Sequence, residues 1–315
     1  QNEKAIFINQ TKYTREILKK FGMESAKSIS TPMSSPCKLD KDENGKKVDI
    51  KSQYPYLLKQ STNKFPIKAG EFIHLDELPE ILQYGIYHCK ITGDDVNKLF
   101  RFNKNNKYTA IDIRRARDLG LTIELIQDGE ANFLYYSRDK LITGSELFGP
   151  YIDLLFPMKQ KGIKTAKLLL NILWGALCQK KIEKRCVSND TEYVIESDSI
   201  ISSLAPSLYK EDSTMIQSYK HSDLYVTNYA RICPFLLSMS RNMTSKIVEK
   251  YINSVVWVHT DGFILNKPLK IQTGEEIGDL HIECIGYCYV KNVCDVTHLM
   301  YDGDTLTDEI GEKFK

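Results

Sequence analysis

The sequence predicts an α+β fold, and three observations carry that prediction. Two long stretches, around residues 158–184 and 229–253, repeat apolar residues at the spacing of a buried helix face. Short runs of β-branched and aromatic residues lie between and after them, and residues 255–265 show the clearest hairpin pattern, with Asp-Gly at the turn. The elements follow no regular strand–helix alternation, which disfavours a doubly wound parallel sheet.

The first 48 residues differ in composition from the rest. A strand-like AIFI and a helix-like KYTREILKKFG occupy residues 1–24, and the Ser-, Pro- and Lys-rich segment 25–48 is typical of a flexible linker. Its last residues, DKDENGKKV, make a poor buried strand by propensity. Aromatic and aliphatic density rises from Asp49 and stays high to about residue 300, so the core is expected there.

The middle of the chain reads as alternating short elements. A Lys/Asn-rich break at 102–107 precedes a short helix predicted at 110–118, which Leu119-Gly120 ends before a strand. The run ANFLYYSR predicts a further strand. A long helix is expected to begin at about residue 158. The apolar positions that place one face of this helix in the core are Leu170, Leu173, Trp174 and Leu177.

The last third is expected to be mainly strands around one helix. Residues 187–222 mix short strands and loops, and the helix of 229–253 leads into the hairpin at 255–265. Beyond the hairpin, residues 278–293 hold two alternating strand-like runs.

Composition limits the class of protein. The 315 residues are 42% hydrophobic and 27% charged with a net charge of +2, so any basic surface is local. No run of eighteen apolar residues occurs, and the start resembles neither a signal nor a transit peptide, so no membrane span is expected. Eight scattered cysteines lack zinc-ligand spacing and predict free thiols in a reducing, intracellular compartment.

Three segments carry side chains suited to chemistry, and the first is the helix predicted from residue 158. A stripe at spacings of four, three and four is made by Gln160, Lys164, Lys167 and Asn171. Two lysines one turn apart, followed by an amide, suit the binding of a polyphosphate. The alternative is an ordinary solvated helix face.

The other two segments each present one aspartate. Asp49 stands at the start of VDIKSQYPYLLK, and Asp261 lies in the turn of the 255–265 hairpin. The alternatives are a turn cap for Asp49 and, for Asp261, the positive φ that Asp tolerates in such turns. Two aspartates from distant segments, with a lysine-bearing helix between them, form the set that two-metal phosphoryl transfer requires. We expect their carboxylates to meet on adjacent strands of one antiparallel sheet.

The order of these segments resembles the polymerase motifs of family B DNA polymerases, in the protein-primed branch of linear plasmids and virus-like elements. DIKSQYP (49–55) is similar to D-x-x-S-L-Y-P, with Gln53 for Leu. KLLLNILWG (167–175) is similar to K-x-x-x-N-S-x-Y-G, with Ile172 for Ser and Trp174 for Tyr. WVHTDG (257–262) is similar to Y-x-D-T-D-S, with Trp257 for Tyr, His259 for the first Asp and Gly262 for Ser. The resemblance covers about residues 48–300.

The resemblance implies a DNA-directed DNA polymerase with a palm, helical fingers, the start of a thumb and no exonuclease domain. It implies two Mg²⁺ ions held by Asp49, Asp261 and the carbonyl of Ile50. Together with the lysine stripe, it implies nucleotide contacts from Tyr54, Lys164, Lys167 and Asn171, of which Lys167 is catalytic with the two aspartates. The implied contacts with primer and template are Tyr287, Tyr289 and Lys291. The implied partners are a DNA primer-template, deoxynucleoside triphosphates and a terminal priming protein.

The resemblance also implies a division of the chain. The segments are an N-terminal extension and linker (1–47), a first palm segment (48–90), an insertion between the first two motifs (91–157), a fingers helix (158–186), a palm segment with the hairpin (187–270), and the late palm with the start of a thumb (271–315).

A second resemblance covers residues 5–47, which are similar to a segment of a copia-type retrotransposon polyprotein. No Y-x-D-D motif follows, so reverse transcription is not implied. Two alternatives to an active polymerase remain at this point. One is a decayed mobile-element product that binds nucleic acid without chemistry, and the other is a retrotransposon-derived fragment.

Overall fold

The computed structural model describes residues 37–38, 45–94, 98–190, 197–208, 210–267, 269–292, 295–302 and 305–313, with side chains described only between 45 and 286. The chain divides into two compact units, Gln1–Cys37 and Lys38–Lys315, and β1 (Cys37–Lys38) lies at their boundary. The predicted features of residues 1–36 lie outside the described residues. All that follows concerns the second unit.

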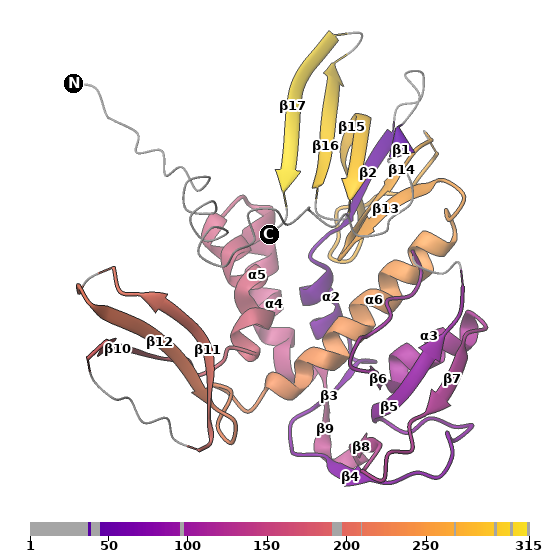
Figure 1. Ribbon diagram of the computed structural model, residues 1–315. Coiled ribbons are helices and arrows are strands. Elements are labelled where there is room, and N and C mark those ends of the chain that lie inside the picture. The colour runs from indigo at the N-terminus through magenta and orange to yellow at the C-terminus, as the bar shows by residue number, and fades with distance from the viewer. Residues whose placement is uncertain are drawn as a thin grey trace. The chain divides into compact units, whose positions relative to one another are not determined.

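The largest sheet supplies the floor of the site. Its strands run in the order β13-β14-β2-β15-β16-β17 (Figure 1), and each pairing in that order is antiparallel. The strands are β2 (Gly45–Ile50), β13 (Val255–His259), β14 (Gly262–Leu265), β15 (Leu280–Asn292), β16 (Asp295–Asp302) and β17 (Thr305–Lys313). The hairpin prediction is confirmed. The two strand-like runs of 278–293 form one long strand, β15.

Strand β2 corrects the prediction that the chain up to residue 48 is a flexible linker. It begins at Gly45, between β14 and β15, and Val48 and Ile50 are completely buried. The two lysines that lower its strand propensity have partners far along the chain. Lys46 Nζ donates to the Leu269 carbonyl at 3.0 Å, and Lys47 forms a 3.0 Å ion pair with Glu283. Tertiary contacts therefore override a weak local preference.

One face of this sheet packs against helix α6 (Cys233–Glu249), the helix predicted within 229–253. Val48, Phe263 and Leu265 from the sheet share a core with Val248 of the helix. The Tyr251 ring, just beyond the helix, stacks on Phe263 with centroids 6.4 Å apart. This contact fixes the central strands against α6.

A second core joins α6 to three further helices, α2 (Gln53–Lys59), α4 (Gly144–Gln160) and α5 (Lys164–Leu177). The prediction of one helix beginning near 158 was wrong. Helix α4 begins fourteen residues earlier, and the chain turns at Gly162, whose φ is +81°. A capping box of Thr143 and Glu146 starts α4, and this T-x-x-E pattern was the available signal. The predicted apolar face of α5 is confirmed at Leu170 and Leu177, both buried.

We expect Leu170→Ala to lower the free energy of unfolding by about 2–5 kcal/mol, because a buried leucine truncated to alanine leaves a cavity. Leu170 is 1% exposed and belongs to the core that holds α5 against α2, α4 and α6. Urea unfolding measures the change. Leu168→Ala is the control, since Leu168 is 58% exposed on the same helix and its truncation should change stability little. Equal losses in the two variants would contradict this assignment of the core face.

Two insertions complete the unit. The first contains helix α3 (Ala110–Asp118), as predicted, which a capping box of Thr109 and Asp112 begins. Its strands are β3 (Lys64–Pro66), β4 (Glu71–Ile73), β5 (Gly85–Thr92), β6 (Lys107–Thr109), β7 (Thr122–Leu125), β8 (Phe133–Tyr135) and β9 (Leu141–Thr143). Strands β4 to β8 form one sheet, and β3 pairs with β9.

The second insertion follows α5 and is a three-stranded antiparallel sheet in the order β10-β12-β11. Its strands are β10 (Glu183–Ser188), β11 (Ser199–Pro206) and β12 (Ser213–Lys220). Strand β10 thus replaces the last part of the helix predicted to reach residue 186. The remaining elements are the short helices η1 (Arg138–Lys140) and η2 (Ala230–Ile232). None of the described helices is both long enough and apolar enough to cross a membrane.

Candidate functional site

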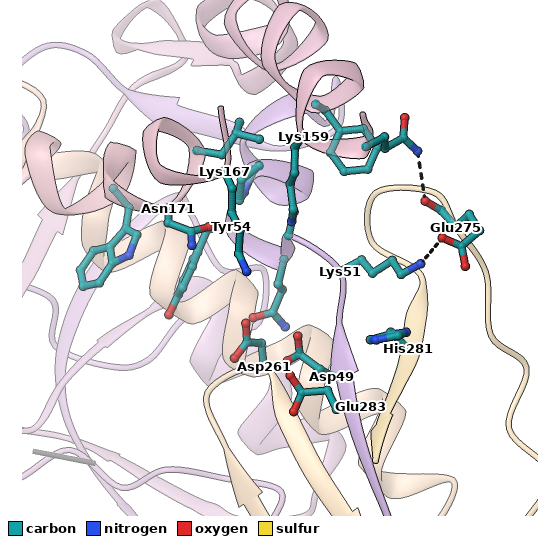
Figure 2. A pocket seen from close by; sticks show the side chains of 17 residues that line it. Asp49, Lys51, Tyr54, Lys159, Lys167, Asn171, Asp261, Glu275, His281 and Glu283 are labelled. Carbon is teal, nitrogen blue, oxygen red and sulfur yellow. Dashed lines mark hydrogen bonds and ion pairs between the residues drawn. The ribbon is translucent and has the colours of Figure 1, made fainter. Parts of the chain in front are cut away.

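A cavity of about 590 Å³ lies where the ends of β2 and β14 meet helices α2, α4 and α5 (Figure 2). Five of the residues predicted to bind metal or nucleotide line it together. They are Asp49, Tyr54, Lys167, Asn171 and Asp261. They come from three segments that span more than two hundred residues of sequence, so the fold brings the three motif-like segments to one place.

The two aspartates meet at the end of a strand pair. Asp49 lies opposite Gly262 in the β2–β14 register, and the Ile50 N–H donates to the Asp261 carbonyl at 3.1 Å. The turn residue with positive φ is Thr260, at 48°, and Asp261 is not among the positive-φ residues of the described chain. A tolerance for positive φ therefore does not explain why an aspartate occupies this turn.

The carboxylates repel one another. Burial raises the pKa of Asp49 to about 7, with further contributions from the nearby charges of Asp261 and Glu283. Glu283 lies at a bulge between Ile282 and Cys284 of β15, on the side of β2 away from β14. Figure 2 shows its carboxylate beside those of Asp49 and Asp261. A bulge changes the direction of a side chain, which places Glu283 at the cavity.

A buried amide ties the carboxylate turn to α2 and α6. Gln53 is 1% exposed, its Nε2 donates to Thr244 Oγ1 at 2.8 Å, and its Oε1 accepts from Ser240 Oγ at 2.5 Å. Thr244 Oγ1 in turn donates to the Thr260 carbonyl at 3.0 Å. Gln53, which stands where the motif D-x-x-S-L-Y-P has Leu, therefore has a structural role, since a leucine could make none of these hydrogen bonds.

Two lysines approach the cavity from the helices. Figure 2 shows Lys167 of α5 extending toward the aspartates and Lys159 descending from α4. Lys159 Nζ donates to Ser52 Oγ at 2.5 Å. Burial lowers the pKa of Lys159, the charge of Lys167 lowers it further, and the charge of Asp49 opposes both. The sequence-based interpretation missed Lys159. It assumed a single helix through 158–186, and the polar stripe of that helix contains Gln160 and not Lys159.

Aromatic side chains form one wall. The Tyr54 ring packs on Trp174 of α5 with centroids 5.5 Å apart and an interplanar angle of 33°. Burial raises the pKa of Tyr54, so its hydroxyl stays protonated at neutral pH. Asn171 is exposed one turn before Trp174. This wall offers a flat apolar surface beside a hydroxyl and an amide.

The rim opposite the aromatic wall joins α4 to the segment before β15. Lys51 Nζ forms a 2.6 Å ion pair with Glu275, and Gln160 Nε2 donates to the Glu275 carbonyl at 3.3 Å (Figure 2). Gln160, from the predicted stripe, thus contacts the rim. Ser52, between the rim and α2, has a left-handed backbone with φ 50°. A serine in this region is uncommon and is typical of a functional turn.

Other predicted residues lie elsewhere. Lys164 is exposed at the first turn of α5 and does not line the cavity. Ile50 is completely buried beside Asp49 and does not line it either. His259, in place of the first Asp of the third motif, stacks on Trp257 with centroids 5.5 Å apart.

The residues predicted to contact primer and template lie on β15. Tyr287 and Tyr289 pair through their backbones with Leu299 and Thr297 of β16, and Lys291 lies at a register shift near the end of the strand. Their side chains lie outside the described part of the structure. Their role stays a prediction.

The donor set fits Mg²⁺. No group of three or more His, Cys, Asp or Glu side chains in the described residues is arranged to hold a metal. Mg²⁺ needs no such cage, since it is usually bound by one or two carboxylates together with water and substrate phosphates. Asp49 and Asp261 offer two carboxylates whose repulsion a cation would relieve. Glu283 is already paired with Lys47.

No protein-family model and no curated protein sequence matches this chain, so the comparisons also lend no support to the retrotransposon resemblance of residues 5–47. Solved structures do match. Phi29 DNA polymerase complexed with single-stranded DNA is 15% identical, with a TM-score of 0.58, over 86% of this chain and 50% of that one. Its ternary complex with primer-template DNA and incoming nucleotides is 16% identical, with a TM-score of 0.56, over 96% and 58%.

At this level of identity the likeness concerns the fold alone. The chain spans about half to three fifths of the length of these polymerase chains. The predicted α+β class, with antiparallel sheets and helices, is confirmed. The chain therefore has a DNA polymerase-like fold.

Proposed function

We propose that this chain is the polymerising portion of a family B DNA polymerase, which adds deoxynucleotides to a DNA 3′ end under the direction of a template. The observation that carries the proposal is the charge arrangement of the cavity. A repelling pair of carboxylates, Asp49 and Asp261, faces a repelling pair of ammonium groups, Lys159 and Lys167. Divalent cations relieve the first repulsion and a triphosphate relieves the second.

Each lining residue then has a task. Lys167 and Lys159 neutralise the triphosphate, and Lys167 stabilises the charge that develops on the leaving pyrophosphate. Tyr54, supported by Trp174, lies under the sugar and excludes a 2′-hydroxyl, while Asn171 contacts the incoming nucleotide. The Gln53–Thr244 hydrogen bonds hold the Asp261 turn in register with Asp49.

The metal requirement follows from the same residues. Asp49 and Asp261 would hold two Mg²⁺ ions, whereas the carbonyl that the resemblance implies as a further ligand belongs to Ile50, which does not line the cavity. When bound, these ions supply activation of the attacking 3′-oxygen and charge neutralisation at the transferred phosphoryl group.

The wider biological role extends this proposal. Tyr287, Tyr289 and Lys291 on β15 contact the primer-template, and a terminal priming protein supplies the first hydroxyl, as the resemblance to the protein-primed branch implies. Replication of a mobile or virus-like element is the corresponding role. DNA complexes of the structurally similar phi29 enzyme support DNA as the partner.

Primer extension tests the proposal. We expect the protein to extend a DNA primer on a template with Mg²⁺ and to add only the complementary nucleotide. Asp261→Asn should reduce extension by about a thousandfold, the upper end of the loss expected when one key electrostatic group is removed from an active site. Asp223→Asn is the control, because Asp223 pairs with Lys181 outside the cavity. DNA binding without extension by the parent protein would instead favour an inactive mobile-element product.

A further inference from the structure

A second cavity, of about 450 Å³, lies between the first insertion and α6. Its walls come from the loop before β3 and the first residue of that strand, from the residue just before β5, from α3 and from α6. The residues used below are Lys64, Tyr84, Arg114, Arg115, Asn242 and Lys246. The polymerase motifs account for none of them.

The cavity is strongly cationic. Four of its lining residues are lysine or arginine and one, Asp118, is acidic, whereas the whole chain has 43 basic and 41 acidic residues. Lys64, Arg114 and Lys246 are exposed, and none of them forms an ion pair with another residue in the described ranges. Their charges are therefore available to an anion.

The fourth cation has a structural role and makes the cavity rigid. Arg115 is 5% exposed, and its guanidinium donates to Ser245 Oγ at 2.9 Å and to Glu249 at 3.0 Å. These bonds fix α3 against α6. On the other wall, Tyr84 stacks on Phe235 with centroids 4.5 Å apart, and its hydroxyl donates to the Lys64 carbonyl at 2.5 Å. The cations are thus presented by a preorganised frame.

The basic surface continues from this cavity into a neighbouring recess. Asn242 also lines a small adjoining recess with Arg101 and Arg241. Arg241 is paired with Asp112 at 3.1 Å, whereas Arg101 is exposed. The exposed charge of Arg101 therefore adds to those of the first recess, and cations spread over two neighbouring recesses suit a polymeric anion better than a single phosphate.

We propose that this second cavity binds backbone phosphates of a single-stranded DNA segment outside the catalytic cavity. Lys64, Arg114 and Lys246 provide the phosphate contacts. A flexible single strand can turn a phosphate into a recess, whereas the phosphates of a rigid duplex lie on its convex surface and reach projecting cations instead. The choice of DNA as the polyanion rests on the proposed function. The inference that the recess binds an anion rests only on its cationic residues.

The test is the salt dependence of binding to a fluorescent single-stranded oligonucleotide. Each lost phosphate contact makes the plot of log K against log salt concentration less steep by about 0.7 for a single strand. If the variant and the parent bind equally at 1 M salt, the variant then binds about fivefold more weakly than the parent at 0.1 M. We expect this change for Lys246→Ala and about twice the change in slope for Arg114→Gln/Lys246→Ala. Lys250→Ala is the matched control, because Lys250 is an exposed lysine one turn along from Lys246, at the end of α6, and lines neither cavity.

Three outcomes would overturn the proposal. The first is an unchanged salt dependence in Lys246→Ala and in the double variant. The second is a change in Lys250→Ala as large as that in Lys246→Ala. The third is a loss of binding to a blunt duplex as large as the loss of binding to the single strand. Competition with tripolyphosphate distinguishes a site for a DNA strand from a site for a small anion. Displacement of the oligonucleotide by a stoichiometric amount of tripolyphosphate would show that the cavity is a site for free phosphate. Nucleotide binding at the catalytic cavity should be unchanged in Lys246→Ala. If the parent protein binds single-stranded DNA but no nucleotide, the proposed function is contradicted. The salt dependence of single-strand binding would still test the second cavity.

Discussion

Lys167→Ala is expected to weaken nucleotide incorporation by roughly a hundredfold to a thousandfold, the effect of removing one preorganised charge from a phosphoryl-transfer site. Lys167 is exposed, lines the cavity and lowers the pKa of Lys159 by charge repulsion. Its removal should therefore also raise the pKa of Lys159. The loss should appear in the affinity for a deoxynucleoside triphosphate with Mg²⁺ and in kcat/KM for addition of a single nucleotide.

The matched control is Lys164→Ala, on the same helix and nearly one turn away. Lys164 is also exposed and carries the same charge, but it does not line the cavity. The sequence stripe predicts a nucleotide contact for both lysines, whereas the structure predicts one for Lys167 alone. Melting temperatures of both variants should match the parent, because exposed helix positions tolerate alanine. A lower melting temperature for Lys167→Ala with unchanged nucleotide affinity would make α5 a purely structural helix.

Lys167 and Lys159, the two lysines that line the cavity from the helices, show why one part of the site was predictable and another was not. Lys167 and its apolar neighbours lie within one unbroken helix, so the spacing alone separates the polar from the buried face. Lys159 belongs to a different helix, and the left-handed turn at Gly162 changes the direction of the chain between them. Periodicity carried backwards across that turn places Gln160 of α4 in the polar stripe and leaves out Lys159.

Strand β2 shows a second limit, which is set by distance along the chain. Residues 45–48 have low strand propensity, and the partners of Lys46 and Lys47 lie more than two hundred residues away. Gln53 is a similar case, since its partners are on α6. By contrast, the hairpin of β13 and β14 and helix α3 contain their own signals, a tight turn and a capping box, and both were predicted.

Asp49→Asn is expected to abolish primer extension and yet to raise the melting temperature of the metal-free protein at pH 8. The pKa of Asp49 is about 7 in the folded protein and its ordinary value is 3.8, chiefly because the carboxyl is buried and secondarily because Asp261 repels its charge. The folded state thus binds this proton more tightly than the unfolded chain does. The contribution of Asp49 to stability therefore falls as the pH rises from about 4 to about 7, and the loss is complete above pH 7.

An asparagine has no charge to bury, so its advantage over the parent should be largest at pH 8 and should shrink as the pH falls toward 4. Asp76→Asn, at a fully exposed carboxylate, is the control and should bring no such gain. Mg²⁺ adds a second readout, because an ion that binds only the folded state raises the melting temperature by mass action. It should stabilise the parent at pH 8 and have little effect on Asp49→Asn. If Asp49→Asn melts below the parent at pH 8, the carboxylates are not held in repulsion, and the argument for a cation between Asp49 and Asp261 fails.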